Sequence, residues 1–212
     1  MSTRAAWLNS LLVDHAFLRI PWRNWGVVES GRLYRSNHPL PWQMREAATR
    51  HGIRSVINLR GHRSECGSDA LGRQAALAAG LTHADQPFES RGAPHKDRLL
   101  RLIGLYRTLP EPILIHCKSG ADRTGLAAGV WHLLQGQGAA AALAELSLRH
   151  GHIAAARTGI LDAFFERYAE AEARGLGFEA WLSGEYDEAE LRAAFKPRPL
   201  AAWFTDRVLR RE

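Results

Sequence analysis

Residues 112–125 read PILIHCKSGADRTG, and this stretch carries most of the information on fold and chemistry. The apolar run from Pro112 to His116 predicts a short buried strand, because aliphatic and β-branched residues favour strands. A glycine-bearing loop follows, and a helix is predicted from Leu126 to Leu134. A loop curled between a strand and a helix N-terminus can turn its backbone N–H groups inward and bind an anion.

Four residues of this loop have a use at an anion site. The positive field of the loop is expected to lower the pKa of the Cys117 thiol and so favour the thiolate. The guanidinium of Arg123 can hold two oxygens of a phosphate in a bidentate fork, which lysine could not reproduce. Gly120 permits a tight or left-handed backbone. The hydroxyl of Thr124 can hydrogen-bond the sulfur and stabilise it as a leaving group.

The spacing of these residues is the Cys-x5-Arg-Ser/Thr signature, spelled HCKSGADRTG here. It resembles the loop of the protein tyrosine phosphatase superfamily, and its central position in the chain resembles the dual-specificity branch. The segments GRLYRS at residues 31–36 and VINLR at residues 56–60 are similar to bacterial dual-specificity-like members. The resemblance covers about residues 25–170.

This resemblance implies a cysteine-dependent phosphatase that needs neither cofactor nor metal. Cys117 would attack phosphorus and form a phosphocysteine, Arg123 would bind the phosphate and stabilise the transferring group, and water would then hydrolyse the intermediate. His116 and Thr124 would support the loop and the sulfur. The implied phosphate-binding residues are Lys118, Ser119, Gly120, Ala121, Asp122 and Arg123.

The general acid is open among three carboxylates. Members of the superfamily supply an aspartate about thirty residues before the cysteine, which favours Asp85, although a predicted strand contains it. Glu89 follows at the start of a loop, and Asp122 lies inside the phosphate loop itself. Each could instead be an ordinary structural or surface carboxylate. The chain lacks a Trp-Pro-Asp triplet, which departs from the superfamily pattern.

Two further residues modify this picture. Lys118 adds a cation beside the nucleophile, as in loops of inositide and phosphatidylglycerophosphate phosphatases, or it simply faces solvent. The implied substrates are therefore a phosphorylated protein or a phospholipid or inositol phosphate. Cys66 is either an ordinary loop thiol, which we favour, or a redox partner that protects Cys117 in a reversible disulfide.

Strands alternate with helices in the first half of the chain, and helices dominate the second half. This pattern predicts an α/β fold with a central, mainly parallel sheet of about four or five strands flanked by helices. The predicted strands lie within residues 26–36 (two short strands around a glycine turn), 53–60, 81–88 and 112–116. The predicted helices are 5–20, 40–50, 70–79, 96–109, 126–134, 139–149 and 153–174. We expect an N-terminal helical extension over residues 1–24, a phosphatase domain over 25–174, and a helical extension over 175–212 packed on it.

Composition narrows the functional classes. The 212 residues are 46% hydrophobic, which suits a globular core, and no apolar run is long enough to cross a bilayer. The start of the chain lacks a secretory signal, so we expect a cytoplasmic protein. Two cysteines exclude a disulfide framework. The net charge of +6 suits an anionic partner, but the basic residues are scattered, which argues against nucleic acid.

Residues 196–211 alternate basic with aromatic or aliphatic residues. Such a helix either packs on its own domain, which we favour, or lies on an anionic membrane at the inner face. No obligate partner is evident. Two other functions stay open: a phosphate-binding module that has lost turnover, and a rhodanese-like sulfurtransferase, which also places a cysteine in an anion-binding loop.

Overall fold

A computed structural model of the chain describes residues 2–197, and its contacts divide it into two compact units. The sheet unit comprises Met1–Pro87 and Leu105–Gly120, and the helical unit comprises Phe88–Gly104 and Ala121–Glu212. Each unit is described by itself. The domain boundaries predicted at residues 24 and 174 stay predictions.

The sheet unit contains a five-stranded sheet, which confirms the predicted fold class. Its strand order is β1-β2-β5-β3-β4; β1 and β2 are antiparallel, and the other pairs are parallel. Each predicted strand is present, although the real ones are shorter. The strands are β1 (Gly26–Glu29), β2 (Leu33–Ser36), β3 (Ser55–Asn58), β4 (Thr82–Asp85) and β5 (Ile113–His116).

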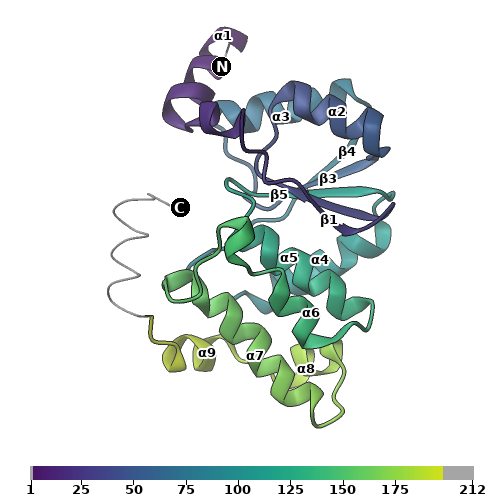
Figure 1. The fold of residues 1–212 in the computed structure, drawn as a ribbon, viewed down its shortest axis with the longest axis vertical. Helices are drawn as coiled ribbons and strands as arrows, with labels where there is room; N and C mark the ends of the chain where they lie inside the picture. Colours follow the sequence, from purple (N-terminus) through teal and green to yellow (C-terminus); the bar gives the residue numbers. More distant parts are fainter. Residues whose placement is uncertain (1, 198–212) are drawn as a thin grey trace. The chain divides into compact units, whose positions relative to one another are not determined.

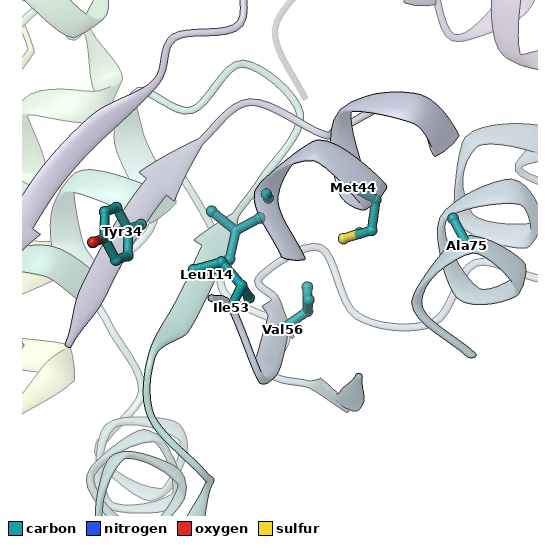
Figure 2. Packing of buried hydrophobic residues seen from close by; sticks show 7 residues of the cluster. Tyr34, Met44, Ile53, Val56, Ala75 and Leu114 are labelled. Atoms are coloured by element: carbon teal, nitrogen blue, oxygen red, sulfur yellow. The ribbon is translucent and has the colours of Figure 1, made fainter. Parts of the chain in front are cut away.

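Helices α2 (Pro41–His51) and α3 (Gly67–Ala78) lie side by side on one face of this sheet (Figure 1). Their apolar side chains pack on the strands in a buried cluster, shown in Figure 2. Burial of such a cluster stabilises the fold because it removes apolar surface from water. The cluster consists of Tyr34, Met44, Ala47, Ile53, Val56, Ala75 and Leu114, with Trp25 and Leu81 at its margin.

The segment before the sheet is not the continuous helix predicted over residues 5–20. It forms α1 (Thr3–Leu8), a π-helical turn η1 (Asn9–Val13) and a 3₁₀ turn η2 (Ala16–Arg19). The break falls where the backbone of His15 is left-handed, with φ of 53°. Asp14, directly before this break, is buried.

The helical unit has a core rich in aromatic rings. Phe164 of α7 contacts the rings of Phe165, Phe178, Trp181 and Tyr186, with centroids 5.0–6.3 Å apart. These rings join α7 to α8 and to the turn after α8 that carries Tyr186, and such ring pairs contribute stability beyond their burial. The helices and turns are α4 (Lys96–Thr108, shared with the sheet unit), α5 (Asp122–Leu134), α6 (Gly138–Ala144), η3 (Leu148–His150), η4 (Arg157–Gly159), α7 (Ile160–Glu172), α8 (Phe178–Gly184) and α9 (Glu188–Ala194).

Three further predicted helices differ from the observed ones. The helix predicted over 139–149 ends already at Ala144 as α6, and a separate 3₁₀ turn, η3, follows. Helix α5 begins at Asp122 instead of Leu126, so the residues that end the signature lie in its first turn. The predicted helix over 153–174 begins only at Ile160. A Cβ on Gly159 would lie 1.8 Å from the carbonyl oxygen of Ala154, so the turn before α7 requires glycine at this position.

Within the described part of the predicted helical extension over 175–212, the chain forms α8, which ends at Gly184, and α9. The proposed membrane-binding stretch over 196–211 lies almost wholly outside the described residues. Among the described residues, no helix is long and apolar enough to span a bilayer.

Candidate active site

Cys117 lies at the carboxyl edge of the parallel sheet, directly after β5. In the pairing of the strands, His116 at the end of β5 lies opposite Ser36 of β2 on one side and opposite Asn58 of β3 on the other. Asn58 in turn pairs with Asp85, the last residue of β4. All four strand ends therefore meet at one edge, which is where open parallel sheets bind their ligands.

The sulfur of Cys117 is buried and receives a main-chain hydrogen bond. The Cys117 side chain is 2% exposed, and the amide of Gly120 donates to its Sγ over 3.2 Å. Gly120 has a φ of +78°, and a Cβ there would lie 2.7 Å from the amide nitrogen of Asn37. The loop therefore needs glycine at this position, as the sequence predicted.

Side chains and backbone of the sheet unit pin three carbonyl oxygens of this loop. Arg35 Nη2 donates to the carbonyl of Gly120 over 2.8 Å, and Asn24 Nδ2 donates to that of Ser119 over 2.8 Å. The amide of His38 donates to the carbonyl of Lys118 over 3.3 Å. Because a trans peptide directs its N–H opposite to its C=O, the amides that follow point the other way, as the amide of Gly120 does toward Sγ.

The second half of the signature opens α5 in the helical unit. Arg123 is 8% exposed, and its Nε has no hydrogen-bond partner within the described part of the chain. The Oγ1 of Thr124, also fully buried, likewise has none there. A buried guanidinium with an unused donor is costly unless an anion meets it. Both residues lie in the first turn of a helix, a position that favours anions.

Asp122 is held by a histidine that sequence reasoning missed. Its Oδ1 lies 2.8 Å from His152 Nδ1, and His152 Nε2 lies 2.6 Å from Asp162 Oδ2. Burial alone would lower the pKa of His152, but the hydrogen bonds and charges of the two carboxylates raise it to about 9. The imidazole is thus cationic at neutral pH and ties the start of α5 to the start of α7. No spacing rule connects a lone histidine to a loop thirty residues away.

Asp85, the first candidate for the general acid, is the last residue of β4. Asn58 Nδ2 donates to its Oδ1 over 3.1 Å, and Arg73 Nη2 donates to its Oδ2 over 2.6 Å. Two strand spacings of about 4.8 Å separate it from His116 along the sheet edge. Asp85 therefore shares the edge with the cysteine, and it is already engaged by two donors.

Glu89, the second candidate, lies in the helical unit and its side chain is half-exposed. Its Oε1 lies 3.4 Å from His95 Nε2 and 3.8 Å from Arg98 Nη1. A Cβ on Gly92 would lie 2.6 Å from Glu89 Oε2, so the carboxylate folds back over its own turn. No measured contact decides among Asp85, Glu89 and Asp122, and the acid stays a prediction.

The two histidines beneath the loop are neutral. His116 is fully buried, and its pKa is lowered well below the usual range by burial and by the nearby His83 and Arg60. His38, whose ring meets that of His116 edge-on at 4.6 Å, has its pKa lowered by burial and by His116 itself. With pKa values lowered in this way, the two rings are unsuited to hold a proton for catalysis.

Lys118 pairs with a carboxylate that the sequence did not indicate. Its Nζ lies 3.5 Å from Oδ1 of Asp14, which belongs to the N-terminal segment. Cys66 is a free thiol at the N-cap of α3, and its pairing with Cys117 stays a prediction.

One cluster of metal-ligand residues lies elsewhere in the described chain. The ligand atoms of His95, Asp97 and Glu188 lie within 4.8 Å of one another. Glu188 accepts hydrogen bonds from the amide of Lys96 over 2.6 Å and pairs with His95 Nδ1 over 2.7 Å. These contacts cap the start of α4, which accounts for the cluster without an ion.

Comparison with known families gives one match. Residues 33–137 match the family model described as "Polymorphic toxin system, DSP-PTPase phosphatase". This range runs from β2 to the end of α5 and contains the whole signature. No curated protein matches the chain by sequence.

Solved structures share the fold at low sequence identity. The core catalytic domain of the PP-IP phosphatase Siw14 from S. cerevisiae is 20% identical, with a TM-score of 0.54 over 73% of this chain and 95% of its own. PTPMT1 is 15% identical, with a TM-score of 0.50 over 71% and 99%. The nma1982 protein of Neisseria meningitidis is 23% identical, with a TM-score of 0.51 over 68% and 95%. At these identities the likeness establishes the fold.

Proposed function

The chain belongs to the dual-specificity type of the protein tyrosine phosphatase superfamily through the domain at residues 33–137, and we propose that it hydrolyses phosphomonoesters through a phosphocysteine on Cys117. The observation that carries this proposal is the buried guanidinium of Arg123, whose Nε lacks a partner among the described residues. Arg123 lies in the first turn of α5, directly after the loop that begins at Cys117, and the sulfur already receives a hydrogen bond from the amide of Gly120.

In the first step the Cys117 thiolate attacks phosphorus. The S–P bond forms as the ester P–O bond breaks, and the leaving oxygen takes a proton from the general acid. The loop amides and the guanidinium of Arg123 hold the non-bridging oxygens, on which charge develops in the transition state. In this way the groups that bind phosphate also lower the barrier.

In the second step water attacks the phosphocysteine. The new O–P bond forms as the S–P bond breaks, a base removes the proton of the water, and the thiolate is regenerated. The hydroxyl of Thr124 stabilises the departing sulfur. Inorganic phosphate is the product.

Hydrolysis of p-nitrophenyl phosphate tests this function. We expect activity that EDTA does not remove, that Cys117→Ser abolishes, and that Arg123→Met lowers by about 10³-fold or more. A rapid-quench experiment with radiolabelled substrate should trap phosphate on Cys117. Trapping without release would favour the binding module, and transfer of sulfur from thiosulfate would favour a rhodanese-like enzyme.

The general acid can be identified by the leaving group. Nitrophenolate leaves readily without a proton, whereas an alkoxide does not. The acid is the residue among Asp85, Glu89 and Asp122 whose amide variant loses far more activity on an alkyl phosphate than on p-nitrophenyl phosphate. Asp85 is our first candidate, because it lies at the same sheet edge as Cys117. A variant that loses the same share of activity on both substrates has changed the structure of the site, and the replaced residue is not the acid.

The charge beside the loop favours a particular substrate class. Arg19 and Arg60 are buried against Asp14, whereas Lys118, which pairs with the same carboxylate, is 25% exposed beside the loop and could meet a second anionic group. We therefore rank substrates with a second anionic group, such as inositol phosphates and phospholipid phosphates, above phosphoserine and phosphotyrosine peptides. A panel of these four classes, compared by kcat/KM, tests the ranking.

The family description adds a biological setting. It assigns related domains to polymorphic toxin systems, and we propose that this phosphatase serves such a system. Expression of the wild-type chain in a bacterial host should then slow growth, whereas Cys117→Ser should not. Equal growth of both strains would contradict an effector role and leave the phosphatase assignment intact.

A further inference from the structure

A buried carboxylate of the N-terminal segment gathers three cations beside the Cys117 loop. Arg19 Nη1 donates to Asp14 Oδ2 over 2.9 Å. Arg60 donates to the same carboxylate twice, over 3.0 Å to Oδ2 and 2.9 Å to Oδ1. Lys118 Nζ approaches Oδ1 to 3.5 Å. Asp14 is thus the common partner of residues from three separate parts of the sequence.

The strand register explains why Arg60 and Lys118 meet there. Asn58 and His116 are paired on the adjacent parallel strands β3 and β5, and each cation follows two residues after its strand end. The amide of Leu59 donates to the carbonyl of His116 over 2.8 Å, which keeps the two chains together past the strands. Asp14 closes this edge by bridging the two cations.

Asp14 is ionised in this cluster, and its three cationic partners differ in exposure. Burial would raise the pKa of Asp14, but hydrogen bonds and charges from Arg60 and Arg19 lower it far below its usual range, so the carboxylate stays ionised. The side chains of Arg19 and Arg60 are 6% and 1% exposed, whereas that of Lys118 is 25% exposed. Lys118 is therefore the cation of the three best placed to meet a ligand.

The segment that carries Asp14 is firmly docked on the sheet unit. Asn9 Oδ1 accepts from the amide of Gly67 over 2.7 Å. The hydroxyls of Ser10 and Ser68 lie 2.7 Å apart. Trp7 stacks on Trp42 with ring centroids 5.9 Å apart. These contacts fix the backbone of the segment, so the position of the Asp14 carboxylate is determined by packing.

We propose that Asp14 is a positioning residue that holds the ammonium group of Lys118 at the rim of the Cys117 loop, where it contacts the bound phosphate ester. The inference rests on the proposed phosphatase function and goes beyond it, since it assigns a role to the segment before the matched domain. Without Asp14, the lysine side chain would sample several rotamers and would meet the ligand for only part of the time.

A double-mutant cycle tests this role with p-nitrophenyl phosphate as substrate and inorganic phosphate as inhibitor. The variants are Asp14→Asn, Lys118→Gln and the double variant, in the full chain. Each single change should raise KM and weaken inhibition by phosphate about fivefold, with kcat within twofold. The double variant should have a KM and an inhibition by phosphate no more impaired than those of the more impaired single variant. Glu111→Gln, which breaks the ion pair with Arg32 before β5, is the control and should leave both constants unchanged.

The outcomes separate the positioning role from a structural one. If the losses of the two single variants multiply, or if Asp14→Asn lowers only the melting temperature, the inference is wrong. If Asp14→Asn does not fold, Asp14→Glu replaces it, and its effect on KM should disappear in the Lys118→Gln background. A wild-type protein without phosphatase activity would overturn the proposed function itself, whereas an active enzyme with additive variants overturns only the role of Asp14.

Discussion

Gly120 determines the shape of the Cys117 loop at the scale of a single residue. Its φ of +78° costs an alanine about 1–2 kcal/mol, and the added Cβ would lie 2.7 Å from the amide nitrogen of Asn37. Gly120→Ala should therefore displace the amide that donates to Cys117 Sγ and lower kcat/KM by about 100-fold or more. Steady-state kinetics check this, and near-normal kcat/KM would show that this amide is unimportant.

His152 makes the stability of the protein depend on pH. Its folded pKa of about 9 lies above the value of 6.5 expected in the unfolded chain. Protonation therefore stabilises the fold fully below pH 6.5, and this contribution is lost as the pH rises through 9. A shift of this size corresponds to an order of 3 kcal/mol.

Urea unfolding at several pH values between 6 and 10 measures this effect. The free energy of unfolding of the wild type should fall across this window more steeply than that of His152→Gln. Parallel curves for the two proteins would contradict the ion-pair arrangement with Asp122 and Asp162.

The residues that the sequence revealed lie close together in the chain, whereas those that it could not reveal come from distant positions. Cys117 and Arg123 lie in one short segment, and their spacing, together with the strand before them and the glycine between them, predicts an anion site. Asp14 and His152 reach the same loop through tertiary packing, from distant positions with no pattern around them. Composition and spacing contain no information on such contacts, and only the fold brings them together.

Elements were predictable where local pattern and packing agree. The apolar strands β3 and β5 and the amphipathic α4 could be read directly, with errors only at their ends. The start of α5 was placed too late because Gly125 reads as a loop residue. Packing requires glycine at position 125 within the helix, because a Cβ there would lie 2.7 Å from Leu146 Cδ2.

The junction of α1 and α3 offers a test at the scale of elements. A Cβ on Gly67 would lie 2.1 Å from the carbonyl oxygen of Ala6 and 2.8 Å from the amide nitrogen of Ser10. Gly67→Ala should therefore push the N-terminal segment off α3 and speed proteolytic cleavage within residues 1–24. Gly104→Ala is the control, because its Cβ would meet nothing within 4 Å. Mass spectrometry of limited digests distinguishes the two, and equal cleavage would mean that α1 adjusts without cost.

On the scale of the whole molecule, the sequence predicted the sheet and the family but not the division into two units. Contacts assign Phe88–Gly104 to the helical unit, although the segments on both sides of it belong to the sheet unit. Linear patterns favour boundaries between consecutive segments, so they cannot predict a unit built from separate stretches of chain. The boundary between the two units falls inside the signature, between Gly120 and Ala121.

A ligand that binds this loop only in the folded protein should raise the free energy of unfolding. A ligand at 100 times its Kd adds about 2.7 kcal/mol to the free energy of unfolding. For a chain of this size, inorganic phosphate should then raise the Tm by about 5–10 °C. Cys117→Ser should keep this increase, because the amides and Arg123 remain, whereas Arg123→Met should reduce it to about 1 °C or less. Differential scanning calorimetry at constant ionic strength, with sodium chloride in place of phosphate as the control, measures the shift. An equal increase in Arg123→Met would mean that phosphate binds at a different place, and the assignment of the anion site to residues 117–123 would fail.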